Sequence, residues 1–325
     1  MQENIVAEPS RPTLGISSCL IGQKVRFDGG HKQNSYILKT LAEHFEFAPF
    51  CPERGIGLPA PRKAIRLVST HELEGTQAIE VNNPDKVFTS QLDDYGRKVA
   101  AQIQHVSGYI VKKDSPSCGM ERVKIYGKEN FPPERNGVGV FTDRLMKELP
   151  TLPVEEEGRL MDPRLRENFI TRVYTLARWQ NMMAAGLTRQ GLVKFHTRHK
   201  FLLLAHHEVT YRELGRMISD VGNGDLASVA SEYLLTLMTG LRNLSTPGKR
   251  VNVLMHIMGF IKDRMTAEEK EELLDLIESH RLGLLPMIGP IILLNHFLRR
   301  YPHEYIEDQY FLTPHPRELM LNNTI

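Results

Sequence analysis

Three short segments, each leading to a cysteine, constrain the fold of this chain more than any other feature. Each segment has the composition of a buried strand. The segments cover residues 14–18, 45–50 and 108–111 and lead to Cys19, Cys51 and Cys118. Helical patterns lie between them, which is typical of an α/β domain with a parallel sheet and flanking helices. Since parallel neighbours end at the same edge of a sheet, we expect the three thiols to lie along one rim.

Composition excludes several classes of protein. The 325 residues suggest about two domains, and a hydrophobic fraction of 41% is enough for packed cores. A formal net charge of +2 gives no general attraction for nucleic acids or membranes. The start of the chain lacks the apolar core of a secretory signal, and the best apolar run, residues 284–294, contains prolines and is too short to span a membrane. Three cysteines, an odd number, then predict reduced thiols and a cytoplasmic location.

The sequence pattern changes between Thr151 and Pro163, where Pro, three consecutive glutamates, Gly and Asp-Pro occur. We interpret this stretch as the exit from the first domain. We expect residues 1–12 to be a disordered lead-in, residues 13–165 an α/β domain, and residues 166–325 an all-α domain. Helical periodicity in the last part predicts helices over 164–185, 191–211, 226–241, 252–265, 266–280 and 288–301. A capping box, Thr266 with Glu269, marks the start of one of them.

The cysteines have a specific chemistry if they meet. Thiolates are soft ligands that bind zinc, copper(I) or iron–sulfur clusters. Structural zinc sites usually contain close pairs such as Cys-x-x-Cys, and this chain has no such pair. Three thiolates on a [4Fe–4S] cluster would leave one iron open to a substrate atom, and a soft iron would prefer sulfur. The alternative is three inert core thiols, because free cysteine is among the most buried residue types.

Characteristic motifs surround all three cysteines: residues 17–20 with 25–30, residues 51–53 with 57–62, and residues 112–119. Together these motifs resemble one family, the thiouracil desulfurase (TudS) family. The resemblance covers about residues 13–165. It implies a [4Fe–4S] cluster on Cys19, Cys51 and Cys118 and removal of sulfur from thiolated uracils. Phe27 replaces the tyrosine that is common before Asp-Gly in the family, which puts any role for that hydroxyl in doubt.

The second half of the chain resembles another family. Residues 192–200, 203–206 and 211–216 are similar to the YbgA family over about residues 185–310. Fusions of the two domains resemble desulfurases of the RudS type, proposed to act on thiouracil and on thiouridine monophosphate. The expected partner is therefore a small thiopyrimidine or thionucleotide, with neither a membrane nor a nucleic acid.

Desulfuration by hydrolysis needs a base and groups that hold the substrate. Glu53 follows a candidate cluster ligand by two residues, so we expect it to be the general base. We assign Ser115 a catalytic hydrogen bond, and expect Ser117, Asp28 and Lys112 to bind the substrate. The alternative for Glu53 is an ion-paired loop glutamate, and the alternative for the serines and the aspartate is ordinary turn chemistry.

The helical half contains basic residues at spacings of three and four, which share a helix face. We expect His199, Lys200, Arg212 and Arg216 to bind the phosphate that distinguishes a nucleotide from a free base. In this hypothesis the helical half packs over the cluster rim. The alternative is a solvated helix face without a ligand.

Two other classes of function compete with the desulfurase. The first is a nucleic-acid-binding protein with structural cysteines and a basic helix on thiolated RNA or on DNA. The chain lacks a clustered aromatic platform, which weakens that interpretation. The second is a cluster-dependent sulfurtransferase that inserts sulfur instead of removing it.

Overall fold

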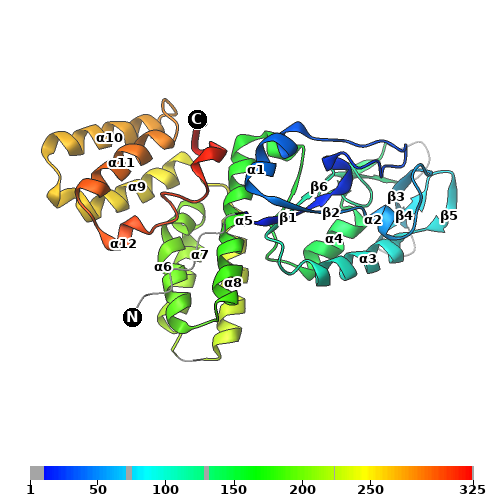
Figure 1. The fold of residues 1–325 in the computed structure, drawn as a ribbon, viewed down its shortest axis with the longest axis horizontal. Helices are drawn as coiled ribbons and strands as arrows, with labels where there is room; N and C mark the ends of the chain where they lie inside the picture. The colour runs from blue at the N-terminus through cyan, green and yellow to red at the C-terminus, as the bar shows by residue number, and fades with distance from the viewer. Residues whose placement is uncertain (1–10, 71–74, 128–131, 223, 324–325) are drawn as a thin grey trace. The chain divides into compact units, whose positions relative to one another are not determined.

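The computed structural model describes residues 11–70, 75–127, 132–222 and 224–323. The chain divides into two compact units, Pro9–Met161 and a second that contains Asp162–Ile325 (Figure 1). This division lies within the predicted exit segment, Thr151 to Pro163. Residues 1–10 of the predicted lead-in lie outside the described residues.

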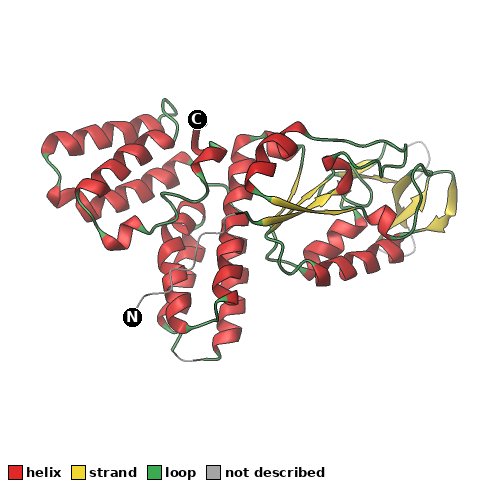
Figure 2. Cartoon of the chain, viewed as in Figure 1, coloured by secondary structure: helices red, strands yellow, loops and turns green. Residues whose placement is uncertain are grey.

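The first unit is built on a four-stranded parallel sheet with strand order β2–β1–β6–β9 (Figure 2). The strands are β1 (Thr13–Ser17), β2 (Glu46–Phe50), β6 (Gly108–Val111) and β9 (Val154–Glu156). Every residue of β6 is buried, as expected for a parallel strand that is covered on both faces. Gly15 is required on β1, because a Cβ there would collide with the ring of Tyr109 on β6. The predicted α/β fold with a parallel sheet is confirmed.

Helices α3 (Thr89–Gln102) and α4 (Val140–Glu148) lie side by side against this sheet (Figure 1). Arg144 on α4 donates to Asp93 on α3 at 2.7 Å, and the Phe141 ring lies 6.0 Å from that of Tyr109. Shorter helical segments follow the first two strands: the 3₁₀ turn Ser18–Ile21 after β1, the π-turn Ile37–Leu41 with α1 (Ala42–His44) before β2, and α2 (Pro52–Gly55) after it.

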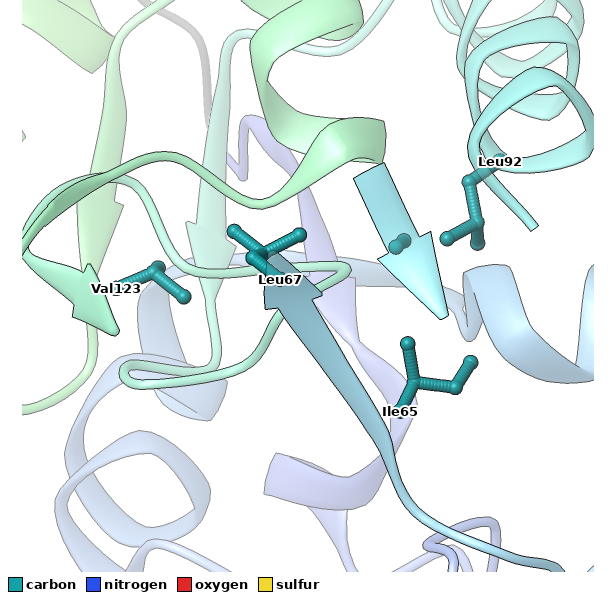
Figure 3. Close-up of a cluster of buried hydrophobic side chains, with 5 residues drawn as sticks. Ile65, Leu67, Leu92 and Val123 are labelled. Carbon is teal, nitrogen blue, oxygen red and sulfur yellow. The ribbon is translucent and has the colours of Figure 1, made fainter. Parts of the chain in front are cut away.

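A second sheet, which the sequence did not reveal, has the strand order β5–β4–β3–β7–β8 and is mostly antiparallel. Its strands are β3 (Ile65–Thr70), β4 (Gly75–Glu80), β5 (Asn83–Val87), β7 (Val123–Tyr126) and β8 (Glu134–Gly137). Buried side chains from β3, β4, β7 and α3 form its core, including Ile65, Leu67, Leu92 and Val123 (Figure 3). Polar edge strands such as β5, with Pro and Asp in its middle, carry little strand signal.

The second unit is all-α, as predicted. It contains α5 (Pro163–Ala184), α6 (Arg189–His206), α7 (Glu208–Ser219), α8 (Leu226–Leu241), α9 (Pro247–Ile261), α10 (Ala267–Arg281), α11 (Ile288–Arg300) and α12 (Glu304–Glu307). Helices α9, α10 and α11 pack beside one another (Figure 1). The capping box of Thr266 and Glu269 is confirmed at the start of α10. Within the described residues, no helix is both long and apolar enough to cross a membrane.

The predicted single helix over residues 191–211 is wrong. The helix is interrupted at His207, which has extended backbone angles and lies between α6 and α7. The His207 side chain accepts the backbone N–H of Thr210 and so caps α7. Local capping by a side chain competes with helix continuation, and here it divides one periodic stretch into two helices.

Acid should destabilise the helical unit. Burial lowers the pKa of His196, His206 and His315 to about 4, from the ordinary 6.5. The unfolded chain therefore binds more protons than the folded unit between about pH 6.5 and pH 4, so stability is lost as the pH falls through this window. Each histidine contributes at most about 1.4 kcal/mol per pH unit.

The single tryptophan, Trp179, reports on this unit, because it is buried against Phe195 and Tyr233. We expect the urea midpoint of Trp179 fluorescence to be clearly lower at pH 5 than at pH 7. A midpoint that does not change over this range would show that the three histidines are not held neutral by the fold.

Candidate functional site

The three cysteines lie where the parallel strands end. Cys19 follows β1 in the turn Ser18–Ile21, Cys51 follows β2 and precedes α2, and Cys118 lies in the loop after β6. Strand β1 pairs in parallel with both β2 and β6, so all three thiols lie at the same edge of the sheet. The predicted common rim is confirmed.

One cavity of about 330 Å³ connects these thiols, and all three cysteines line it. Cys19 and Cys118 are each 8% exposed, and Cys51 is half-buried. Burial raises the pKa of Cys19 to about 11, and the charge of Cys51 adds to this effect. Burial also raises the pKa of Cys118 well above its usual value, with smaller contributions from Cys51, Glu53 and Cys19. The thiols therefore lie close enough to disfavour one another's ionisation.

The side chains of the described residues do not form a site for a single metal ion. Among the described residues, no three His, Cys, Asp or Glu side chains converge closely enough to hold one metal ion. The thiols instead reach the cavity from three separate strand ends, so a shared ligand must be wide enough to touch all of them. A cluster of several irons with thiolate ligands fits this arrangement, and its positive irons would offset the cost of ionising buried thiols.

Glu53 lines the same cavity and is held at both carboxylate oxygens. The Arg62 Nε donates to Oε2 at 2.7 Å, and Arg62 Nη2 lies 2.5 Å from the same oxygen. The Ser117 hydroxyl donates to Oε1 at 3.0 Å. The carboxylate is thus ion-paired, as the alternative interpretation expected, and it also faces the thiols, as the catalytic interpretation requires.

The two serines of the Cys118 loop have different surroundings. The Ser115 hydroxyl accepts the backbone N–H groups of Ser117 at 3.3 Å and Cys118 at 3.1 Å, and Ser115 lines the cavity. Ser117 is fully buried and lies behind the wall, where it donates to Glu53. The Ser117 hydroxyl proton is used in this hydrogen bond, and a contact of Ser117 with the substrate stays a prediction.

Asp28 does not reach the cavity. Its side chain is 48% exposed and accepts the backbone N–H of Gly30 at 2.9 Å. That hydrogen bond holds the pKa of Asp28 below its usual value. Asp28 is absent from the residues that line the cavity, and its role in substrate binding stays a prediction. The neighbouring side chains of Arg26 and Phe27 line the cavity instead.

Cationic side chains dominate the charged part of the cavity wall. Lys112 is one of them, and its ammonium forms an ion pair with Glu157. The other cations are Arg26, Lys32, Arg62 and Lys113. Within the described residues, the amines of Lys32 and Lys113 have no carboxylate partner within ion-pair distance. The two acids of the wall are Glu53, paired with Arg62, and Asp114, paired with Arg135.

The three consecutive glutamates have a structural role that the sequence does not reveal. Instead of forming part of a domain exit, they belong to or follow the buried edge strand β9. Glu156 accepts the backbone N–H of Met120 at 2.9 Å, and Glu157 accepts that of Lys113 at 2.8 Å. These carboxylates hold both ends of the loop that carries Cys118. An acidic run directly after a short apolar segment was the available signal.

The basic residues of the helical unit do not form one exposed face. His199 is 1% exposed, and its ring stacks on Phe195 at 3.9 Å. This side of α6 lies in the core, and phosphate binding by His199 stays a prediction. The Lys200 ammonium lies 4.5 Å from the centre of the Tyr305 ring.

The two arginines of α7, Arg212 and Arg216, are exposed. Arg212 forms an ion pair with Glu208, with 2.5 Å between Nη2 and Oε1, so its guanidinium already has an acidic partner. Exposed pairs of this kind contribute little to stability, so Arg212 remains able to exchange its partner.

Three thiols and a carboxylate thus surround one cavity at the carboxyl edge of a parallel sheet, which is where open α/β sheets bind their ligands. Residues 14–157 match the model of the 2-thiouracil desulfurase family, and residues 200–316 match that of a protein family of unknown function, DUF1722. The chain belongs to the 2-thiouracil desulfurase family and carries a YbgA-like domain after the desulfurase domain.

Individual relatives cover each part of the chain. The uncharacterized protein YbgA of Escherichia coli K12 is 28% identical over 162 residues, which are 50% of this chain and 96% of YbgA. The uncharacterized protein YbbK of Bacillus subtilis 168 is 32% identical over 108 residues, which are 32% of this chain and 71% of YbbK. A solved structure of the [4Fe-4S]-dependent thiouracil desulfidase TudS is 25% identical, covers 47% of this chain and 95% of its own, and has a TM-score of 0.38.

Proposed function

We propose that this protein removes sulfur from thiolated uracils by hydrolysis, which converts C=S to C=O and releases hydrosulfide. The observation that carries the proposal is the meeting of Cys19, Cys51, Cys118 and Glu53 in one cavity of a chain from the 2-thiouracil desulfurase family. Three inert core thiols would not need a carboxylate beside them.

Cys19, Cys51 and Cys118 are proposed to hold a [4Fe–4S] cluster. With three protein thiolates, such a cluster supplies an iron that can act as a Lewis acid toward the sulfur of the substrate. The buried thiols and the loop bonds from Glu156 and Glu157 would keep the ligands in place. Lys112 lies on the same wall and contributes positive charge beside the ligands.

Glu53 is proposed to accept a proton from the water that attacks the ring carbon. Arg62 and Ser117 fix the direction of its carboxylate, so the base needs little reorganisation during the reaction. Ser115 lines the cavity with a hydroxyl whose oxygen is already an acceptor, which leaves its proton for a donated hydrogen bond to the substrate. Proton transfer from water balances the release of hydrosulfide, so the reaction requires no reductant.

Purified, cluster-loaded protein tests this function directly. Incubated with 2-thiouracil or 4-thiouracil without a reductant, it should remove the thiocarbonyl absorption and form uracil. Retention of both substrates over many hours, by protein with a full complement of iron, would contradict the proposal. A sulfurtransferase would instead form thiouracil only when an activated sulfur donor is supplied.

A phosphate on the substrate would suit this cavity. We propose that thiouridine monophosphate is a substrate and that Lys32 and Lys113 bind its phosphate, because both amines lack a carboxylate partner among the described residues. Changing either lysine to Ala should raise KM for the nucleotide about tenfold, since a charge-assisted hydrogen bond is lost, and leave KM for 4-thiouracil unchanged.

Lys24→Ala is the matched control, because Lys24 is exposed and lies outside the cavity wall. If the lysine variants handle the nucleotide normally while the Arg212→Ala, Arg216→Ala double variant does not, the phosphate is bound by the helical unit, with Lys200 as a further contact. Equal behaviour of every variant with both substrates would contradict phosphate recognition in either unit.

A further inference from the structure

We propose that Arg62 is the positioning residue of this site and that it selects Oε1 of Glu53 as the atom that accepts the proton. This inference rests on the proposed function, because it concerns the same carboxylate. Arg62 is itself part of the cavity wall and also binds the Glu53 carboxylate.

The two carboxylate oxygens of Glu53 receive different numbers of donors. Oε2 receives two donors from Arg62, Nε at 2.7 Å and Nη2 at 2.5 Å. A carboxylate oxygen has about two lone-pair sites, so Oε2 is saturated. Oε1 receives the Ser117 hydroxyl at 3.0 Å and no other donor within the described part of the chain. One lone pair of Oε1 is therefore left for a water molecule in the cavity.

The remaining nitrogen of the Arg62 guanidinium, Nη1, binds the backbone of the cavity wall. Arg62 Nη1 donates to the backbone carbonyls of Val25 and Pro59, each at 2.9 Å. The Arg62 backbone N–H also donates to the carbonyl of Phe27 at 2.8 Å. Val25 and Phe27 line the cavity, so Arg62 fixes one wall of the site relative to Glu53.

The ion pair of Arg62 and Glu53 is largely buried. The Arg62 side chain is 6% exposed and that of Glu53 is 14% exposed, so water screens their interaction only weakly. One planar guanidinium binds three acceptor atoms, Oε2 of Glu53 and the carbonyl oxygens of Val25 and Pro59, and a lysine ammonium cannot reproduce those directions. Replacing Arg62 by Lys therefore keeps the positive charge and removes the geometry.

Kinetics of Arg62→Lys separate positioning from folding. We expect kcat to fall about a hundredfold, the cost of misplacing a catalytic group by about an ångström, with KM within about twofold of wild type. Arg54→Ala is the matched control, because the exposed side chain of Arg54 donates to the carbonyl of Leu58 at 2.7 Å and lies outside the cavity wall. It should have wild-type kcat.

A double-mutant cycle tests whether Arg62 acts through Glu53. If it does, Arg62→Lys should have almost no further effect on kcat in the Glu53→Gln background. Additive losses of the two changes would overturn the proposal, because they would show that Arg62 acts through another group.

Chemical modification gives a readout that does not depend on activity. In cluster-loaded protein, carbodiimide with glycine ethyl ester should label Glu53 several-fold faster in Arg62→Lys and Arg62→Ala than in wild type or Arg54→Ala, with exposed Glu43 as the internal standard. Equal labelling of Glu53 in all four proteins would overturn the inference, even if the wild type desulfurates thiouracil. If the wild type is inactive but the labelling differs as expected, the proposed function fails and the Arg62–Glu53 clamp stands.

Discussion

Each of the variants Cys19→Ser, Cys51→Ser and Cys118→Ser should lose nearly all iron, visible absorbance and desulfurase activity together. The three thiols reach the cavity from the ends of β1, β2 and β6. Because the chain has only these three cysteines, no other thiol can replace any one of them. Serine keeps the size of the side chain but offers a hard, weakly acidic oxygen in place of a soft thiolate. Iron, acid-labile sulfide and the visible spectrum are measured on protein purified without oxygen.

Ser18→Ala is a suitable control for packing, because Ser18 is buried beside Cys19 and does not line the cavity. It should retain the iron of the wild type. A cysteine variant that keeps full iron and sulfide would remove that residue from the ligand set. Unfolding of the α/β unit is monitored by circular dichroism, so loss of iron can be separated from loss of fold.

Glu53→Gln is the second change with a large expected effect. Glutamine keeps the size of the side chain and can still accept the Ser117 hydrogen bond, but it cannot take up a proton from water. We expect the variant to keep its iron and to lose a factor of about 10² to 10⁴ in kcat, the usual worth of a positioned base. The measurement is the initial rate of loss of 4-thiouracil at saturating substrate.

Glu46→Gln provides the control, because Glu46 is an exposed glutamate on β2. It should have the kcat of the wild type. A Glu53→Gln variant that keeps more than about a third of the wild-type kcat would show that another group moves the proton, since even a modest general base contributes more than that.

The sequence predicted the rim of the sheet because two local signals agreed there. The strands are short and apolar, and the residues that follow them are typical of loops, so the ends of β1, β2 and β6 could be located closely. Because these strands are parallel neighbours in the sheet, the three thiols that follow them lie together at one edge. That step follows from the usual topology of α/β domains.

The second sheet and the functions of individual polar side chains could not be predicted in the same way. Strand β9 is only three residues long, and its Glu156 accepts backbone N–H groups that lie 36 and 35 residues away in the sequence. Ser117 and Glu53 are 64 residues apart and meet only in the folded chain. By contrast, Asp28 bonds to Gly30 within its own turn, and that local bond fixed its direction.

His199 shows the limit of reasoning from helix spacing. Positions three and four apart share a face of a helix, but the spacing does not tell which face is covered. In α6 the His199 ring stacks on Phe195 of the same helix and packs against Tyr310 from outside it. Arg212 and Arg216 belong to the next helix, which the sequence did not separate from the first at His207.

The central claim is that the thiol-lined cavity of this chain hydrolyses thiouracil. It is tested most directly by incubating cluster-loaded protein anaerobically with 4-thiouracil in H₂¹⁸O, without a reductant. The account predicts uracil that contains one ¹⁸O atom, one hydrosulfide released per uracil, and no product from Cys118→Ser protein. Product formed by colourless, iron-free protein, or no conversion by fully loaded protein, would contradict it.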